Sequence, residues 1–290
     1  MSHTARGSSF VCSSAGANAS DRKYWSLLPP FSSRITRMKQ VPRKEGVHVL
    51  TQPLKPPGLP DIRLSMAAVE LEHESGLALI GALAPTNELL SHIEMLGKPV
   101  RHILLPNTSP EHWIFGPDLS RCYQDAKMWV VKGFMEGKGV PLPGRSLLFR
   151  EAQKRGILKT IPSGGEVNDE FPLQDIGAYT LDVPFFIESL IHLKEKDIIM
   201  VADTGIFLSS DDDEYSSGKV NTALAESLGI WNKLGPITKV VQETYDVESR
   251  KWAQQVLDDA EFDMVLAAHG TPIVADGKHQ FRQCFSFLFD

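Results

Sequence analysis

The stretch His102-Ile103-Leu104-Leu105-Pro106-Asn107-Thr108-Ser109-Pro110-Glu111-His112 joins an apolar run to a short polar segment. The run from Val100 to Leu105 predicts a strand that ends at Pro106, because proline cannot donate to a strand ladder. The polar segment then predicts a loop at the end of the strand, where α/β proteins commonly hold functional side chains. Glu111 and His112 offer an oxygen and a nitrogen donor, which both suit zinc or iron.

Two further apolar runs also end at a polar side chain. Asp203 follows the run 197–202, and His269 follows the run 262–268. Because loops at strand ends converge on one edge of an α/β fold, we expect both side chains to lie near Glu111 and His112. Together they would form a metal site. The alternative is that each side chain only satisfies hydrogen bonds of its own turn.

Composition limits the classes of function. The 290 residues are 42% hydrophobic and 23% charged, as in ordinary globular proteins. A net charge of -6 gives no reason to expect a nucleic-acid partner, and no uninterrupted apolar stretch reaches the length of a membrane span. Cys12, Cys122 and Cys284 are far apart and form no CxxC pair, which argues against a disulfide scaffold or a cysteine zinc site.

The N-terminal region differs in charge from the rest of the chain. Residues 1–44 contain eight Lys and Arg residues and one acidic residue, Asp21. This basic, Ser-rich composition is typical of a transit peptide for a plastid or mitochondrion, although a disordered leader without an address fits equally well. A proline-rich connector is expected over residues 51–60. We therefore predict a disordered leader and linker over residues 1–60 and a compact domain over residues 61–290 of an intracellular protein.

Strand and helix patterns alternate in the compact region, and the two β-rich halves predict an α/β sandwich covered by helices. The expected strands are residues 62–71, 77–80, 100–105, 127–131, 185–193, 197–202 and 262–268, with further strands that include Phe171, Ile176, Tyr179 and Leu181. The expected helices are residues 86–96, 116–123, 146–155, 219–234, 247–260 and 278–289.

The order of these motifs resembles the metallo-β-lactamase superfamily, in which HxHxDH after a strand is followed by a histidine, a bridging aspartate and a final histidine before glycine. The matching segments here are residues 102–112, 200–205 and 266–270. The chain is most similar to the DUF4336 branch, through residues 83–86, 97–100 and 188–192. The resemblance spans roughly residues 61–288 and implies an αββα sandwich.

The resemblance also implies that the two metal sites of the superfamily differ in this chain. The first-site positions fall on Asn107, Ser109 and a residue near Phe185 or Phe186, so the first site is expected to be lost.

By the same comparison, the positions of the second metal fall on residues that can all ligate: Glu111, His112, Asp203 and His269. This set implies a single zinc, iron or manganese ion. Glu111 stands where the superfamily has aspartate, and it has the alternative role of a general base on metal-bound water.

Two functions fit these features. One is a metal-dependent hydrolase of ester, thioester, amide or phosphoester bonds. The other is a non-catalytic domain that binds a small molecule in the former active-site cleft or a protein at a sheet edge. The chain has no GxSxG elbow and no nucleotide-binding loop, which argues against a serine hydrolase or a nucleotide enzyme. His192 lies within an apolar strand, so it is either a core histidine or, by the family pattern, one that approaches the site.

Overall fold

The computed structural model describes residues 35–54, 62–163, 166, 168–210 and 219–290. The greater part of the predicted leader lies outside these residues, as do residues 211–218 of the acidic loop. The targeting role of the leader therefore stays a prediction. None of the described helices is both long enough and apolar enough to cross a membrane.

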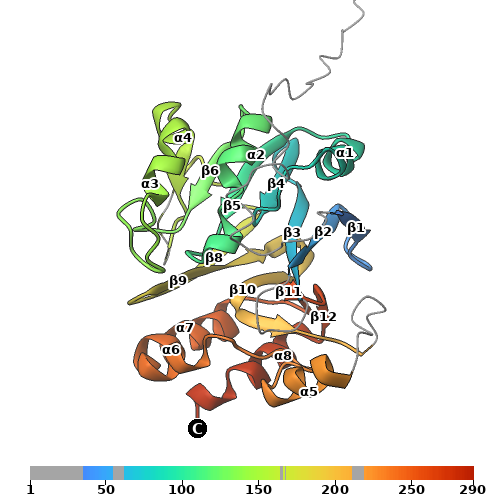
Figure 1. The fold of residues 1–290 in the computed structure, drawn as a ribbon, viewed down its shortest axis with the longest axis vertical. Helices are drawn as coiled ribbons and strands as arrows, with labels where there is room; N and C mark the ends of the chain where they lie inside the picture. Colours follow the sequence, from blue (N-terminus) through green and yellow to red (C-terminus); the bar gives the residue numbers. More distant parts are fainter. Residues whose placement is uncertain (1–34, 55–61, 164–165, 167, 211–218) are drawn as a thin grey trace, which may run out of the picture.

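Twelve strands form one continuous curled sheet among the described residues (Figure 1). Its main path runs β7-β6-β5-β4-β3-β11-β10-β9-β8, while β2 pairs with β1 and β3, and β12 pairs with β11. The strands are β1 (Arg37–Gln40), β2 (Val47–Leu54), β3 (Ile62–Leu71), β4 (Gly76–Ile80), β5 (Val100–Leu105), β6 (Lys127–Val130), β7 (Leu158–Thr160), β8 (Ile176–Val183), β9 (Phe186–Leu193), β10 (Ile198–Phe207), β11 (Met264–Gly270) and β12 (Ile273–Ala275).

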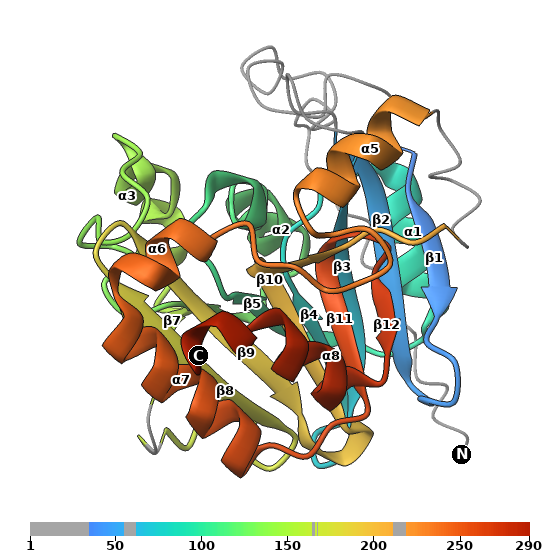
Figure 2. The ribbon, with the colours of Figure 1, turned by 90° about the horizontal axis from the view of Figure 1, so that it is seen from below.

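Helices cover both outer sides of the curled sheet. In Figure 1, α1 to α4 lie on one side and α5 to α8 on the other, and Figure 2 shows α6, α7 and α8 lying across β8, β9 and β10. This arrangement confirms the predicted α/β sandwich with outer helix layers. The helices are α1 (Asn87–Met95), α2 (Gly116–Cys122), α3 (Arg145–Leu148), α4 (Arg150–Lys154), α5 (Lys219–Ser227), α6 (Lys239–Thr244), α7 (Asp246–Asp259) and α8 (Gly277–Cys284).

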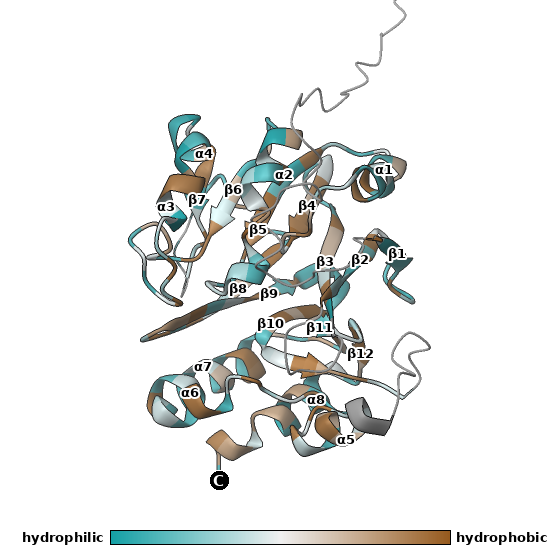
Figure 3. Cartoon of the chain, viewed as in Figure 1, coloured by the Kyte–Doolittle hydropathy of each residue, from teal (hydrophilic) through white to brown (hydrophobic). Residues whose placement is uncertain are grey.

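The alternation of side chains along the central strands divides the interior into two cores. On β10, Ile198 and Met200 pack in the larger core between the two halves of the sheet, whereas Ile199 and Val201 pack beneath α7 and α8. Successive side chains of a strand point to opposite faces, so a strand buried on both faces needs an unbroken apolar sequence. Figure 3 shows hydrophobic segments concentrated on the strands between the helix layers.

The prediction that residues 51–60 form a connector is wrong for its first four residues, which belong to β2. Pro53 lies beyond Thr51, where the pairing of β2 with β1 ends, so on that side of β2 no strand requires the missing amide hydrogen. Three short strands, β1, β7 and β12, and the helix α6 were not predicted, and β1 lies within the region predicted to be a disordered leader. The helix expected over residues 146–155 is divided into α3 and α4 at Phe149.

The aromatic packing beneath α7 and α8 should dominate the stability of that side of the fold. Phe281 is fully buried and contacts Trp252, Phe262 and Phe285. We predict that Phe281→Ala lowers the free energy of unfolding by about 3–5 kcal/mol, measured by urea denaturation, because the substitution leaves a cavity. Phe289→Ala, at a position that is 36% exposed, is the matched control and should cost much less.

Candidate metal site

The loop after β5 is held in place by a buried tryptophan. Glu111 and His112 lie on a single 3-10 turn, Pro110–His112, in which the His112 amide donates to the Ser109 carbonyl at 3.1 Å. The next residue, Trp113, is fully buried, and its indole nitrogen donates to the Thr108 carbonyl at 2.9 Å. Trp113 therefore anchors the loop in the protein interior, and His112 beside it also points inward.

Asp203 lies where the sheet locally separates. The pairing of β10 with β9 ends at Met200, and its pairing with β11 shifts register between Val201 and Ile206. The segment between these points leaves the regular ladder. The side chain of Asp203 is consequently free to enter the interior at the end of the strand rather than pack in either apolar core.

His269 lies near the end of β11, and the glycine after it is required by the local geometry. Gly270 has φ +83°, and a Cβ atom there would lie 2.2 Å from the carbonyl oxygen of Phe207. Only glycine satisfies both conditions without strain. The close approach of the two strand ends brings His269 beside Asp203.

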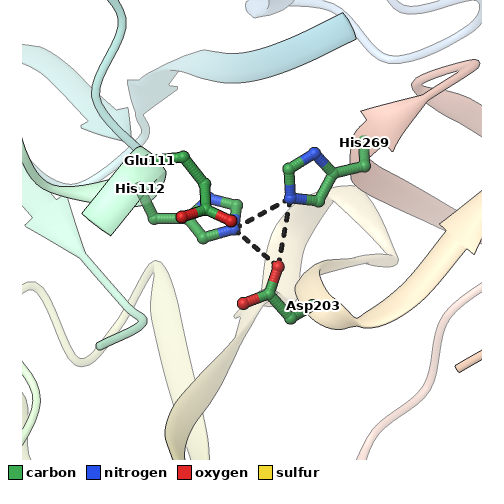
Figure 4. A group of neighbouring side chains, drawn as sticks. All are labelled: Glu111, His112, Asp203 and His269. Atoms are coloured by element: carbon green, nitrogen blue, oxygen red, sulfur yellow. Dashed lines mark hydrogen bonds and ion pairs between the residues drawn. The ribbon is translucent and has the colours of Figure 1, made fainter. Parts of the chain in front are cut away.

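Three donor atoms form a nearly equilateral triangle (Figure 4). Nε2 of His112 is 3.0 Å from Oδ1 of Asp203, Nε2 of His269 is 3.1 Å from the same oxygen, and the two nitrogens are 3.1 Å apart. Glu111 completes the group, in which one possible ligand atom from each residue lies within 4.8 Å of the others. His112, Asp203 and His269 are buried and Glu111 is half-buried, so the group faces outward through the glutamate. The structure thus places side by side the four residues that the sequence predicted to lie close together.

The other oxygen of Asp203 is engaged by the loop after β5. Oδ2 accepts a hydrogen bond from the Ser109 hydroxyl at 2.5 Å and another from the Asn107 side-chain amide at 3.2 Å. The side-chain oxygen of Asn107 in turn accepts a hydrogen bond from the backbone amide of Ser109 at 2.6 Å. Asp203 therefore divides its two oxygens between two different sets of partners.

Glu188 is the residue of β9 whose side chain contacts Asn107, and neither Phe185 nor Phe186, the predicted counterparts of the third first-site position, lies beside Asn107. The Asn107 amide donates to Oε2 of Glu188 at 2.7 Å, whereas Phe185 is 72% exposed and Phe186 packs in the core beneath α7 and α8. The sequence signal was a single acidic residue inside a mostly apolar strand. Such a residue is costly to bury unless donors surround it.

His192 does not approach the cluster. It lies four residues beyond Glu188 on an extended strand, about 13 Å away, and its Nε2 contacts the backbone carbonyl of Glu261 at 2.9 Å. His102 is likewise outside the group, since its Nδ1 accepts a hydrogen bond from Trp129 at 2.9 Å. Both histidines serve the packing of the sheet.

Neighbouring charges shift the pKa values of the buried residues at the site. Burial lowers the pKa of His112, but the charge and hydrogen bond of Asp203, with contributions from Glu111 and Glu188, outweigh it and raise the pKa to about 9. Burial raises the pKa of Asp203, yet the charge and hydrogen bonds of His112 and His269 bring it well below its ordinary value. Burial and the neighbouring Asp203 raise the pKa of Glu188. The site thus attracts positive charge, either as a proton on His112 or as a metal ion.

The donor set fits a transition-metal ion. Ligand atoms held about 2.1 Å from zinc are about 3.0–3.5 Å apart, and the edges of the triangle measure 3.0 to 3.1 Å. Nδ1 of His269 has no hydrogen-bond partner among the described residues. If Nε2 coordinates a metal ion, Nδ1 carries the proton of the neutral imidazole and has no acceptor among the described residues, unlike the second nitrogen of most metal-bound histidines.

Comparison with known families places the chain. The family model described as "Domain of unknown function (DUF4336)" matches residues 59–225. The chain belongs to the DUF4336 family. The matched region contains Glu111, His112 and Asp203, whereas His269 lies beyond it. No curated protein matches the sequence.

Solved structures show that this DUF4336 chain has the metallo-β-lactamase fold. A fragment (residues 1–254) from Nostoc sp. PCC 7120, described as a putative diflavin flavoprotein A 5, has a TM-score of 0.58 at 13% identity, covering 89% of this chain and 96% of the fragment. The metal-soaked Flv1 flavodiiron core from Synechocystis sp. PCC6803 has a TM-score of 0.57 at 8% identity, covering 89% and 61%. The DIM-1 metallo-β-lactamase has a TM-score of 0.52 at 13% identity, covering 88% and 96%. Identities this low show the fold alone.

The raised pKa of His112 predicts how the stability of the metal-free protein depends on pH. A histidine whose pKa rises from 6.5 when unfolded to about 9 when folded stabilises the folded state fully below pH 6.5. That contribution is lost as the pH rises through 9. In EDTA, the free energy of unfolding should therefore fall between pH 6.5 and 9, and His112→Gln should flatten this part of the profile. Equal pH profiles for the two proteins would contradict the assignment.

Proposed function

We propose that the chain binds one divalent metal ion, zinc, iron or manganese, through Glu111, His112, Asp203 and His269. The observation that carries the proposal is the triangle of two imidazole nitrogens and one carboxylate oxygen at mutual distances of 3.0 to 3.1 Å. Three electron-rich atoms so close together need a positive charge among them, which either a metal ion or a proton on His112 supplies. The metal-binding folds named among the similar structures support the same interpretation.

We also propose that the first metal site of the superfamily is lost. Its positions are occupied by Asn107 and Ser109, and their polar atoms are used in hydrogen bonds to Asp203, to Glu188 and to each other. Because Oδ2 of Asp203 accepts two of these bonds, that oxygen is not available to bridge a second ion. The geometry therefore supports one ion rather than a pair.

Metal analysis tests the proposal. Protein purified without chelator, or stripped and reloaded with Zn²⁺, should hold about one equivalent by inductively coupled plasma mass spectrometry. Asp203→Asn and His269→Ala should reduce the content to below about a tenth of an equivalent, because each removes a ligand. His192→Gln, which removes a histidine outside the cluster, should leave the content unchanged.

Two results would contradict the proposal. Metal content below a tenth of an equivalent in the folded, reloaded protein would exclude the site and leave a metal-free binding domain as the better interpretation. About two equivalents, both lost in Asp203→Asn, would show that the first site persists.

A hydrolase activity at this site is the second candidate, and the position of Glu111 favours it. Its carboxylate is half-buried and accepts no hydrogen bond among the described residues, unlike the carboxylates of Asp203 and Glu188. When bound, a divalent ion would acidify water and polarise a carbonyl or phosphoryl oxygen. Glu111, at the outer side of the cluster, would accept the proton of that water and deliver it to the leaving group of an ester, thioester, amide or phosphoester.

Substitution of Glu111 distinguishes a base from a ligand. If Glu111 is the base, Glu111→Gln should keep about one equivalent of metal and lose turnover by about 10²–10⁴-fold in an ester and phosphoester screen. Loss of metal together with turnover would instead assign Glu111 as a ligand. Turnover that persists in His269→Ala would show that the activity does not arise at this site.

A further inference from the structure

The strongest feature that the metal proposal leaves unused is the buried carboxylate of Glu188. We propose that Glu188 is a positioning residue that fixes Asp203 and the loop after β5 relative to one another, an inference that rests on the proposed metal site. Glu188 is fully buried within β9, a strand whose residues are all buried. Five donors converge on its two oxygens.

Three consecutive backbone amides of β10 point at this carboxylate. The Ala202 amide donates to Oε1 at 2.8 Å, while the Asp203 and Thr204 amides donate to Oε2 at 2.8 and 3.1 Å. The Thr204 hydroxyl also donates to Oε1, at 2.5 Å. This is the segment in which β10 has left the ladder with β9. The Glu188 carboxylate therefore supplies the acceptors that the backbone of a neighbouring strand would otherwise provide.

The same strand also contacts the loop that carries the other ligands. The Ser189 amide donates to the Pro106 carbonyl at 2.7 Å and the Thr108 amide donates to the Ile187 carbonyl at 3.1 Å. Between these contacts, Asn107 donates from one amide nitrogen to both Glu188 and Asp203. Glu188 thus acts on Asp203 twice, through its backbone amide and, by way of Asn107, through its side chain.

Glutamine cannot reproduce this arrangement although it has the same shape. Each oxygen of Glu188 accepts at least two donors. A glutamine amide nitrogen in either place would face donors and leave them without an acceptor. The carboxylate is therefore required for its acceptor capacity. Loss of this capacity should loosen the segment that presents Oδ1 of Asp203 to the histidines.

Co²⁺ titration of the full chain, followed by the visible absorption of the bound ion, tests the proposal. We expect Glu188→Gln to raise the Kd for Co²⁺ by about 10–100-fold, the usual effect of losing a partner that orients a metal ligand. The absorption bands should also change, because they report the placement of the ligands. Circular dichroism of the metal-free form would establish that the variant is folded.

Asp175→Asn is a matched control. Asp175 is also a buried carboxylate that accepts backbone amides, those of Glu72 and His73, but it lies before β8 and away from the cluster. This variant should lower the melting temperature without changing the Kd for Co²⁺. A Glu188→Gln protein that behaves in the same way would show that Glu188 is merely structural and would overturn the proposal.

Two further outcomes keep the test decisive. If Glu188→Gln does not fold, Thr204→Val removes only one of the five donors and should weaken Co²⁺ binding to a smaller extent. An unchanged Kd in this variant would overturn the role of Glu188. If the unmodified protein takes up no Co²⁺, the metal site and the positioning role fail together, whereas normal uptake by folded Glu188→Gln refutes the positioning role alone.

Discussion

The divergence of β9 from β10 after Met200 is the constraint on which the rest of the site depends. Where two neighbouring strands separate inside a protein, their backbone amides need other acceptors. The Glu188 carboxylate meets that need, and β9 then pairs with the loop after β5 instead. This exchange of partners brings Asn107 and Asp203 together at one edge of the sheet. The cluster exists because the sheet is interrupted at this point.

Asp203 connects the two parts of the polar interior. One oxygen faces two imidazoles and the other faces a hydroxyl and an amide. Buried charges are tolerated only when they are paired and hydrogen-bonded, and each carboxylate of the site meets this requirement differently. Hydrogen-bond donors stabilise the carboxylate of Glu188, whereas Asp203 needs a positive partner. A proton on His112 and a metal ion can each supply the positive charge that the Asp203 carboxylate requires, so metal binding should compete with protonation of His112.

Much of the fold and most of the cluster could be predicted from the sequence. The strand Val100–Leu105 was marked by its apolar run and by Pro106, and His269 by its place before Gly270. The partner of Asn107 could not be predicted, because which residue of β9 faces the loop depends on where two strands separate. Pro53 led to the prediction of a connector in place of the end of β2. Whether a strand tolerates a proline depends on where the pairing with its neighbour ends, which local sequence does not show. Such features are set by tertiary pairing and leave little trace in local sequence.

The position of β11 has a consequence for how the chain acquires its structure. This strand lies between β3 and β10 in the sheet, yet it comes after both of them in the chain and outside the region that matches the family model. During synthesis on the ribosome, the nascent chain therefore holds two incomplete halves until residues 264–270 emerge. The open edge of β10 is exposed to aggregation over that interval. We therefore expect β11 to join the sheet after its neighbours and to bring His269 to the cluster at that stage.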